Sequence, residues 1–347
     1  MKKLFTILSI ALLQATSTDA QHNFNGFSQY YPIGEGPNIN LRTSYVKSET
    51  ILFEANPTVR YSFYNDMQKK LGENRNHAHA YYIAARPQLR MYTDSSLPVK
   101  MPAYRVLLST QQLWRVKDHN LFSFSIESGH YSNGQSGCAF NELYTDGSRE
   151  CDSVYSLITD DTDLSAILNR RNGNFSTNMT ELLFNYRINR LDDDDMPDRV
   201  HSITFGATLF HDRFLGIFDF GGYSDADIKI YGRFRFHAGY EYERVLNNGM
   251  RLSVSENMEL ISKPHKSVNP FRSVTTVTWF PKKLVKEFGV YMSYVFGHDN
   301  YNFRFVDSGH QGVIGITWSG FPPFALTNGA PPEDRTHVPG LPEDDEE

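Results

Sequence analysis

The sequence lacks most of the features that identify common binding proteins. It has two cysteines in 347 residues and no C-x-x-C or histidine-rich spacing, so the sequence indicates no cysteine-based metal site. The formal net charge is −6, and no basic stripe with interleaved aromatic residues occurs. We therefore exclude nucleic acid as a partner. The chain also lacks any long helical periodicity.

Long apolar runs are equally scarce, because the only continuous one lies between Leu4 and Leu13. Lys2 and Lys3 precede it, and small residues follow it up to Ala20. This pattern predicts a secretory signal peptide over residues 1–20, too short for a transmembrane helix. Residues 21–40 are predicted to form a polar N-terminal segment. Residues 321–347 are rich in proline and acidic residues, which predicts a disordered tail.

Aromatic residues, by contrast, are abundant, with 20 Tyr and 25 Phe, and many lie in alternating runs. In the clearest run, from Tyr231 to Tyr242, the even positions are mainly apolar and the odd positions include Arg233 and Arg235. A period of two predicts strands with one apolar and one polar face. Similar runs occupy residues 203–209, 252–260, 290–296 and 314–318.

A secreted β-sandwich would show the same alternation, with its polar face in water. Three features favour a membrane barrel: aromatic residues near the ends of the apolar faces, full charges on the opposite faces, and no helices to cover a sheet. A β-sheet in hydrocarbon must close on itself. We therefore predict an all-β fold, a transmembrane antiparallel β-barrel of about 12 strands over residues 41–320, in the bacterial outer membrane.

The longest irregular stretch, residues 136–173, is predicted to be an external loop, because such barrels have short periplasmic turns and longer outer loops. It contains Cys138 and Cys151, which fit an oxidising compartment. A disulfide between them is favoured over free thiols or metal ligands. The acidic run Asp192–Asp195 follows the next strand, and a solvated turn at the inner rim is favoured over an ion site there.

The segment from His130 to Gln135 closes an alternating strand that starts at Phe122. Since residues two apart point to the same side of a strand, His130 and Ser132 share the apolar face of Phe122. A serine hydroxyl is a weak nucleophile and needs a base within hydrogen-bonding reach, and a third group must orient that base. A nucleophile and a base on an apolar face indicate chemistry at a lipid boundary.

The strand that leaves the long loop supplies a candidate for the third group. Leu182, Phe184 and Tyr186 are its apolar outward residues, so parity places Asn178 on the same face. An amide facing lipid is costly unless it is hydrogen-bonded, and a bond to His130 would satisfy both groups. An isolated His-x-Ser pair is usually coincidence, but the matching parity of Asn178 favours a catalytic Ser–His–Asn triad.

The pattern His-x-Ser-Asn-Gly followed by an asparagine on the next strand resembles the outer membrane phospholipase A family. Its members are calcium-dependent lipid hydrolases built as twelve-stranded barrels. The resemblance implies that His130 is the general base, Ser132 the nucleophile and Asn178 the orienting residue, with the Gly134 N–H donating to the oxyanion. It also implies a phospholipid substrate from the outer leaflet and regulation by dimerisation with a second copy of the chain.

The resemblance further implies a calcium ion, Ca2+, near the nucleophile. The family binds calcium through the backbone carbonyl at the position of Gln135, where it has arginine, and through a serine that aligns with Asn174. An asparagine oxygen can also bind calcium, with Ser176 or a loop carboxylate such as Asp160, Asp161 or Asp163 as alternatives. The loop before Asn174 is much longer than in the family.

Together these patterns predict an outer-membrane esterase that hydrolyses acyl esters of glycerophospholipids. Two alternatives stay open at this point. One is a non-enzymatic barrel, either a small porin or a surface-binding protein. The other is a lipopolysaccharide deacylase, which would share the chemistry and differ in substrate.

Overall fold

The computed structural model describes residues 33–318 except residue 35, residues 46–50, 68–69, 71–74, 94–98, 117–119, 192–196, 247–249, 282–287 and residue 304. The predicted signal peptide, most of the predicted N-terminal segment, the acidic turn at Asp192–Asp195 and the predicted tail lie outside the described residues.

Thirteen antiparallel strands form one sheet in the described part of the chain. They are β1 (Asn38–Tyr45), β2 (Ile51–Asn56), β3 (Val59–Asn65), β4 (His77–Tyr92), β5 (Val99–Arg115), β6 (Leu121–Ser132), β7 (Ser176–Leu191), β8 (Pro197–His211), β9 (Phe234–Val245), β10 (Arg251–Ile261), β11 (Phe271–Phe280), β12 (Phe288–His298) and β13 (Ser308–Trp318). Sequential neighbours pair from β4 to β13, and the sheet closes because β1 pairs with β13 and β2 pairs with β4.

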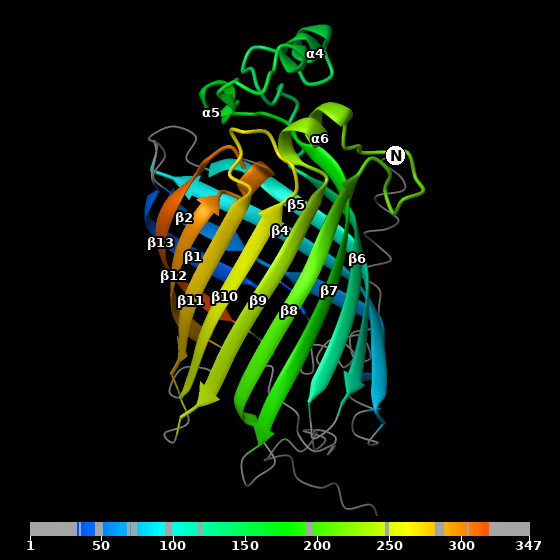
Figure 1. Cartoon of the computed structure of the whole chain (residues 1–347), viewed down its shortest axis with the longest axis vertical. Coiled ribbons are helices and arrows are strands. Elements are labelled where there is room, and N and C mark those ends of the chain that lie inside the picture. The colour runs from blue at the N-terminus through cyan, green and yellow to red at the C-terminus, as the bar shows by residue number, and fades with distance from the viewer. Residues whose placement is uncertain are drawn as a thin grey trace, which may run out of the picture.

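The thirteen strands occupy twelve strand positions around the closed barrel, because β2 and β3 lie in the same position, one after the other along β4. Both pair with β4, β2 opposite residues 89–92 and β3 opposite residues 80–85. Pro57 lies between them and has no N–H to donate to the ladder, which explains the interruption. The predicted fold, an antiparallel barrel of about twelve strands, is therefore confirmed, and Figure 1 shows its tilted strands.

The barrel wall is apolar on its outer surface and polar toward the lumen, as the alternating runs predicted. Large exposed apolar side chains include Leu182 and Phe184 of β7, Phe205 of β8, Phe234, Phe236 and Tyr240 of β9, and Val290, Met292 and Tyr294 of β12. Buried ion pairs face the lumen: Arg86 with Glu127 at 2.6 Å, Arg90 with Glu54 at 2.6 Å and Arg251 with Glu243 at 3.1 Å. This distribution is the one that outer-membrane barrels have.

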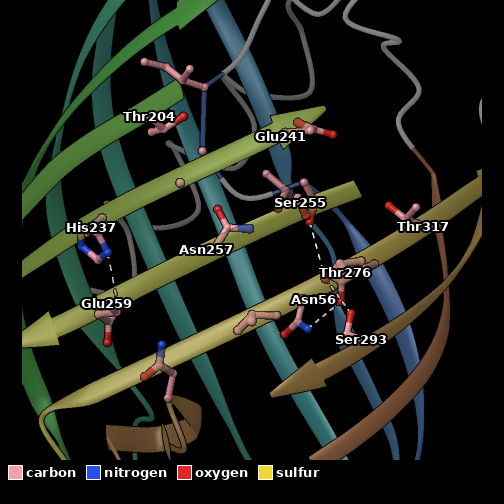
Figure 2. A pocket seen from close by; sticks show the side chains of 18 of the residues that line it. Asn56, Thr204, His237, Glu241, Ser255, Asn257, Glu259, Thr276, Ser293 and Thr317 are labelled. Atoms are coloured by element: carbon pink, nitrogen blue, oxygen red, sulfur yellow. Dashed lines mark hydrogen bonds and ion pairs between the residues drawn. The ribbon is translucent and has the colours of Figure 1, made fainter. Parts of the chain in front are cut away.

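The middle of the lumen holds a cavity of about 610 Å³ with a mainly polar wall. Figure 2 shows His237 of β9 beside Glu259 of the adjacent strand β10 in the wall of this cavity, with Nδ1 and Oε2 3.5 Å apart. Farther along the same wall, on the adjacent strands β11 and β12, the hydroxyl groups of Thr276 and Ser293 lie 2.7 Å apart.

Aromatic side chains fill the lumen above this cavity, at the end of the barrel where β6 joins β7, here called the loop end. The ring of Phe303 lies 5.5 Å from that of Tyr131 and 5.3 Å from that of Phe210, centroid to centroid. The Arg235 guanidinium lies 4.4 Å from the Phe210 ring centroid and 3.9 Å from that of Phe305. All four aromatic side chains are buried, so the cluster packs inside the lumen at the loop end.

Short helices lie at the loop end: α4 (Arg149–Ser156), α5 (Leu164–Ile167), α6 (Asp225–Tyr231) and the 3-10 turn η2 (Tyr301–Phe303). Figure 1 shows α4 and α5 above the barrel, within the long loop between β6 and β7. Cys138 and Cys151 form a disulfide there, with their Cα atoms 5.6 Å apart, as predicted. None of the helices among the described residues is long and apolar enough to cross a membrane.

The predicted strand from Tyr231 to Tyr242 is wrong at its start. Tyr231 is the last residue of α6, and β9 begins only at Phe234. The helix forms because Ser224 and Asp227 make a capping box at its first turn, and Gly232, at φ 72°, ends it. The apolar alternation masked these signals.

Candidate active site

Strands β6 and β7 bring the predicted catalytic side chains to one face of the barrel. In their register, His130 lies opposite Asn178 and Ser132 lies opposite Ser176. Along β6 every odd residue is buried and every even residue is partly exposed. His130 and Ser132 therefore point away from the lumen, at the loop end of the strand, on the same side as Phe122.

The amide of Asn178 is oriented by three backbone carbonyls. Its Nδ2 group lies 3.1 Å from the oxygen of Asp212, 2.8 Å from that of Phe220 and 2.5 Å from that of Gly221. Only an N–H group can face carbonyl oxygens, so Oδ1 must face His130, whose Nδ1 lies 3.0 Å away. Nδ1 then carries the proton, and Nε2 is left as the basic nitrogen.

Asn178 is completely buried, although its parity places it on the outer surface. The segment that covers it comprises residues 212–221, between β8 and α6, and is called here the aromatic loop. Its Phe220 ring lies 5.5 Å from the His130 ring, centroid to centroid. Sequence reasoning did not identify this loop. Its only local signal is a Phe-Leu-Gly-Ile-Phe run at a position where a polar turn would be ordinary.

Ser132 is the last residue of β6 and is partly exposed. In the described part of the chain no hydrogen bond joins its hydroxyl to His130, although the two residues share one face of the strand. Such bonds are often long before substrate binds and shorten in the complex. The arrangement therefore places a hydroxyl and a base side by side at the edge of the apolar surface.

The residue after Ser132 fixes the turn that follows. Asn133 is buried, its Oδ1 accepts hydrogen bonds from the N–H groups of Gln135 and Phe175, each at 3.2 Å, and its Nδ2 donates to the Gly173 oxygen at 2.8 Å. Gly134, which lies between Asn133 and Gln135, is exposed and has a φ of 64°. Its N–H has no acceptor among the described residues and is available to a ligand. Asn133 is a positioning residue that the sequence analysis did not single out.

The residues predicted to bind calcium lie next to a carboxylate that was not predicted. Asn174 precedes β7, and its Nδ2 donates to Oδ2 of Asp146 at 2.7 Å. The Asp146 N–H in turn donates to the Ser136 oxygen at 2.8 Å, so this carboxylate lies beside the Gln135–Ser136 segment. No group of three or more His, Cys, Asp or Glu side chains able to hold a metal occurs among the described residues.

Two of the suggested loop acids lie elsewhere. Asp161 is 3.5 Å from the Lys266 ammonium, and Asp163 accepts a hydrogen bond at the start of α5. Both have partners away from Asn174, whereas the Asp146 carboxylate accepts a hydrogen bond from the Asn174 amide.

A cavity of about 660 Å³ lies between α4, α6 and the start of β7. Ser176, the register partner of Ser132, lines it together with Asp146, Asn174 and Asp227, so the cavity adjoins the site. Burial raises the pKa of the Asp227 carboxyl above its ordinary value, hydrogen bonds from Ser224 oppose that shift, and the nearby Asp146 carboxylate adds to it. The carboxylates of Asp146, Asp152 and Asp227 thus line this cavity together with aromatic side chains such as Tyr155 and Tyr231.

The fold and the site define the chain as a closed twelve-stranded β-barrel with a histidine–asparagine pair and a serine on its outer face. No protein-family model and no curated protein matches it.

Several solved barrels are similar in outline. Outer membrane phospholipase A of Escherichia coli has a TM-score of 0.47 and 9% identity over 86% of this chain and 98% of that one. The calcium-bound dimer of the Salmonella typhi outer membrane phospholipase has a TM-score of 0.46 and 10% identity over 87% and 98%. The β-domain of the Bordetella autotransporter BrkA has a TM-score of 0.34 and 10% identity over 82% and 98%. At these values the likeness bears on neither the catalytic residues nor the activity.

Proposed function

We propose that the protein is an outer-membrane phospholipase that hydrolyses acyl esters of glycerophospholipids with Ser132, His130 and Asn178. The observation that carries this proposal is the orientation of Asn178. Three backbone carbonyls accept hydrogen bonds from its Nδ2 group, so its Oδ1 faces Nδ1 of His130. Nε2 of the imidazole is then left as the basic nitrogen, on the side of the barrel that faces lipid. A polar pair of this kind has no role in packing an apolar surface.

The reaction that these residues support is acyl transfer to serine. Ser132 Oγ attacks the ester carbonyl while His130 Nε2 takes its proton, and the imidazolium then protonates the departing glycerol oxygen. Water, deprotonated by the same nitrogen, releases the fatty acid from Ser132. Asn178 keeps the imidazole in the productive tautomer, and because it is neutral it stabilises the imidazolium less than a carboxylate would.

The developing oxyanion would be held by the free N–H of Gly134, since a preformed donor at this point stabilises the transition state. The oxygens of Gln135 and Asn174 and the Asp146 carboxylate are ligands of the kind that calcium takes, so this donor set fits the ion. When bound there, calcium supplies Lewis-acid stabilisation of the same oxyanion.

The porin alternative is disfavoured by the aromatic cluster that fills the lumen at the loop end, around Phe303 and Arg235. An open channel would need that space for water. A lipopolysaccharide deacylase would use the same residues, and identification of the released products separates it from a phospholipase.

The test is a hydrolysis assay on the refolded full chain in mixed micelles of phosphatidylcholine, with calcium or with a chelator. We expect turnover by the wild type with calcium, a decrease with chelator, and a loss of about 10³-fold or more in Ser132→Ala and His130→Ala. Absence of turnover by the folded wild type would overturn the enzymatic function. Full turnover by Ser132→Ala would overturn the assignment of the nucleophile.

A further inference from the structure

The aromatic loop, residues 212–221, exposes an unusual amount of apolar surface. It carries five large apolar side chains: Phe214, Leu215, Ile217, Phe218 and Phe220. Three of them are more than half exposed, Ile217 at 72%, Phe218 at 56% and Phe220 at 51%. Contiguous exposed apolar side chains mark a surface that meets another apolar phase.

The loop has a defined shape. Phe214 and Phe218 exchange backbone hydrogen bonds of 2.8 and 2.9 Å, and Leu215 and Gly216 turn the chain between them with φ values of 52° and 74°. The rings of Phe214 and Phe220 lie 4.8 Å apart, centroid to centroid. The result is a tight reversal with Ile217 next to its tip.

The base of the loop is attached to the outside of the barrel. The Asn178 side chain, on the outward face of β7, donates to carbonyls at both ends of the loop, those of Asp212 and Gly221. In Figure 1 the yellow-green segment between β8 and α6 extends outward from the loop end. Farther along β7 the outward face continues with Leu182 and Phe184, which are exposed as well. The loop therefore lies on the same face of the barrel as these apolar side chains, with Thr180 between them on β7.

We propose that the aromatic loop binds acyl chains of the surrounding membrane leaflet and forms a wall along which one chain reaches Ser132. Ile217 and Phe218 enter the apolar layer, and Phe220, which contacts the His130 ring, lies at the site end of the wall. The charged Arg213 and Asp219, both exposed, lie at the level of the headgroups. The role of the wall in catalysis rests on the proposed function, whereas the contact with lipid does not.

The first experiment measures the lipid contact without activity. A cysteine is introduced as Phe218→Cys and labelled with an environment-sensitive fluorophore, in the full chain reconstituted into phosphatidylcholine vesicles that contain acyl-chain spin labels. The matched control is Leu157→Cys, 77% exposed after α4, and the native cysteines do not react because they form a disulfide. We expect strong quenching by spin-labelled lipid at position 218 and weak quenching at position 157. Equal quenching, or equal accessibility of both labels to aqueous iodide, would overturn the lipid contact.

The second experiment tests the wall. Phe218→Ser should lower the turnover of long-chain phospholipid about tenfold more than that of a short-chain soluble ester, because it removes one apolar contact with a long chain. Leu143→Ser, 87% exposed in the other loop, should leave both rates at the wild-type level. An equal loss on both substrates would show a purely structural role. If the wild type hydrolyses neither ester, the proposed function fails, and the quenching result still decides the lipid contact.

Discussion

The two sides of strand β6 carry polar clusters of opposite character, three residues apart. On the lumen side, Glu127 is completely buried and accepts hydrogen bonds from Tyr82 at 2.8 Å and Arg86 at 2.7 Å, which connects β6 to β4 across β5. On the outer side, His130 contacts Asn178 of the next strand. The same strand thus carries one member of a charged pair on its inner face and one member of a hydrogen-bonded polar pair on its outer face.

The two clusters differ in whether a hydrogen-bonding atom is left without a partner. The charges of Glu127 and Arg86 neutralise each other, and such pairs contribute to structure. In the outer pair the hydrogen bonds of Asn178 fix the imidazole, while Nε2 of His130 has no partner among the described residues. A fixed ring with one available nitrogen is what a general base requires.

The largest expected effect comes from breaking the inner cluster. Glu127→Ala leaves the Arg86 guanidinium buried without its counterion, which should lower the free energy of unfolding by about 3–5 kcal/mol. Urea unfolding of the refolded barrel in micelles measures this loss. Glu127→Gln, which keeps an oxygen acceptor for Tyr82, is the matched variant and should lose less. Hydrolysis per folded molecule should stay at the wild-type level in both, and a decrease without a loss of stability would show that the two clusters are not separate.

A smaller effect is expected from changing the outer cluster with Asn178→Asp. A carboxylate supports an imidazolium better than an amide does, but it has no N–H to donate to the carbonyls of Phe220 and Gly221. We therefore expect a loss of activity of about 100-fold, similar to that of Asn178→Ala, because the base is no longer held. Steady-state hydrolysis of phosphatidylcholine by the three proteins measures it. Wild-type activity in Asn178→Asp would show that the carbonyl contacts do not matter.

Strand periodicity allowed much of this arrangement to be predicted. The outward position of His130 and the position of Asn178 on the adjacent strand both follow from a period of two, and the register places them directly opposite each other. The number of strands in the ring, about twelve, follows in the same way from the number of alternating runs.

The contacts that complete the site could not be predicted, because they join segments that are distant in the sequence. The carbonyls of the aromatic loop are 34 to 43 residues away from Asn178. Asp146 reaches Asn174 only because the long loop folds back on the start of β7, and no local pattern encodes that return. Periodicity determines which face a side chain occupies, whereas the loops determine what covers it.

The smallest of the three effects tests whether the aromatic loop positions His130. A Cβ atom at Gly221, where φ is 63°, would lie 2.5 Å from Cε1 of His130, so Gly221→Ala must displace the ring. We expect a loss of activity of about tenfold and an altered pH–rate profile, since small misplacements of a base are costly.

Gly216→Ala is the matched control, because Gly216 also has a positive φ, 74°, but a Cβ there would meet no atom within 4 Å. It carries the same kind of backbone strain, about 1 kcal/mol, without a contact to the imidazole. If the two variants lose activity equally, the loss comes from backbone strain in the loop and not from displacement of the His130 ring. The aromatic loop then does not belong to the outer cluster of β6. If only Gly221→Ala loses activity, the loop belongs to the outer cluster, since it then fixes both the amide and the ring.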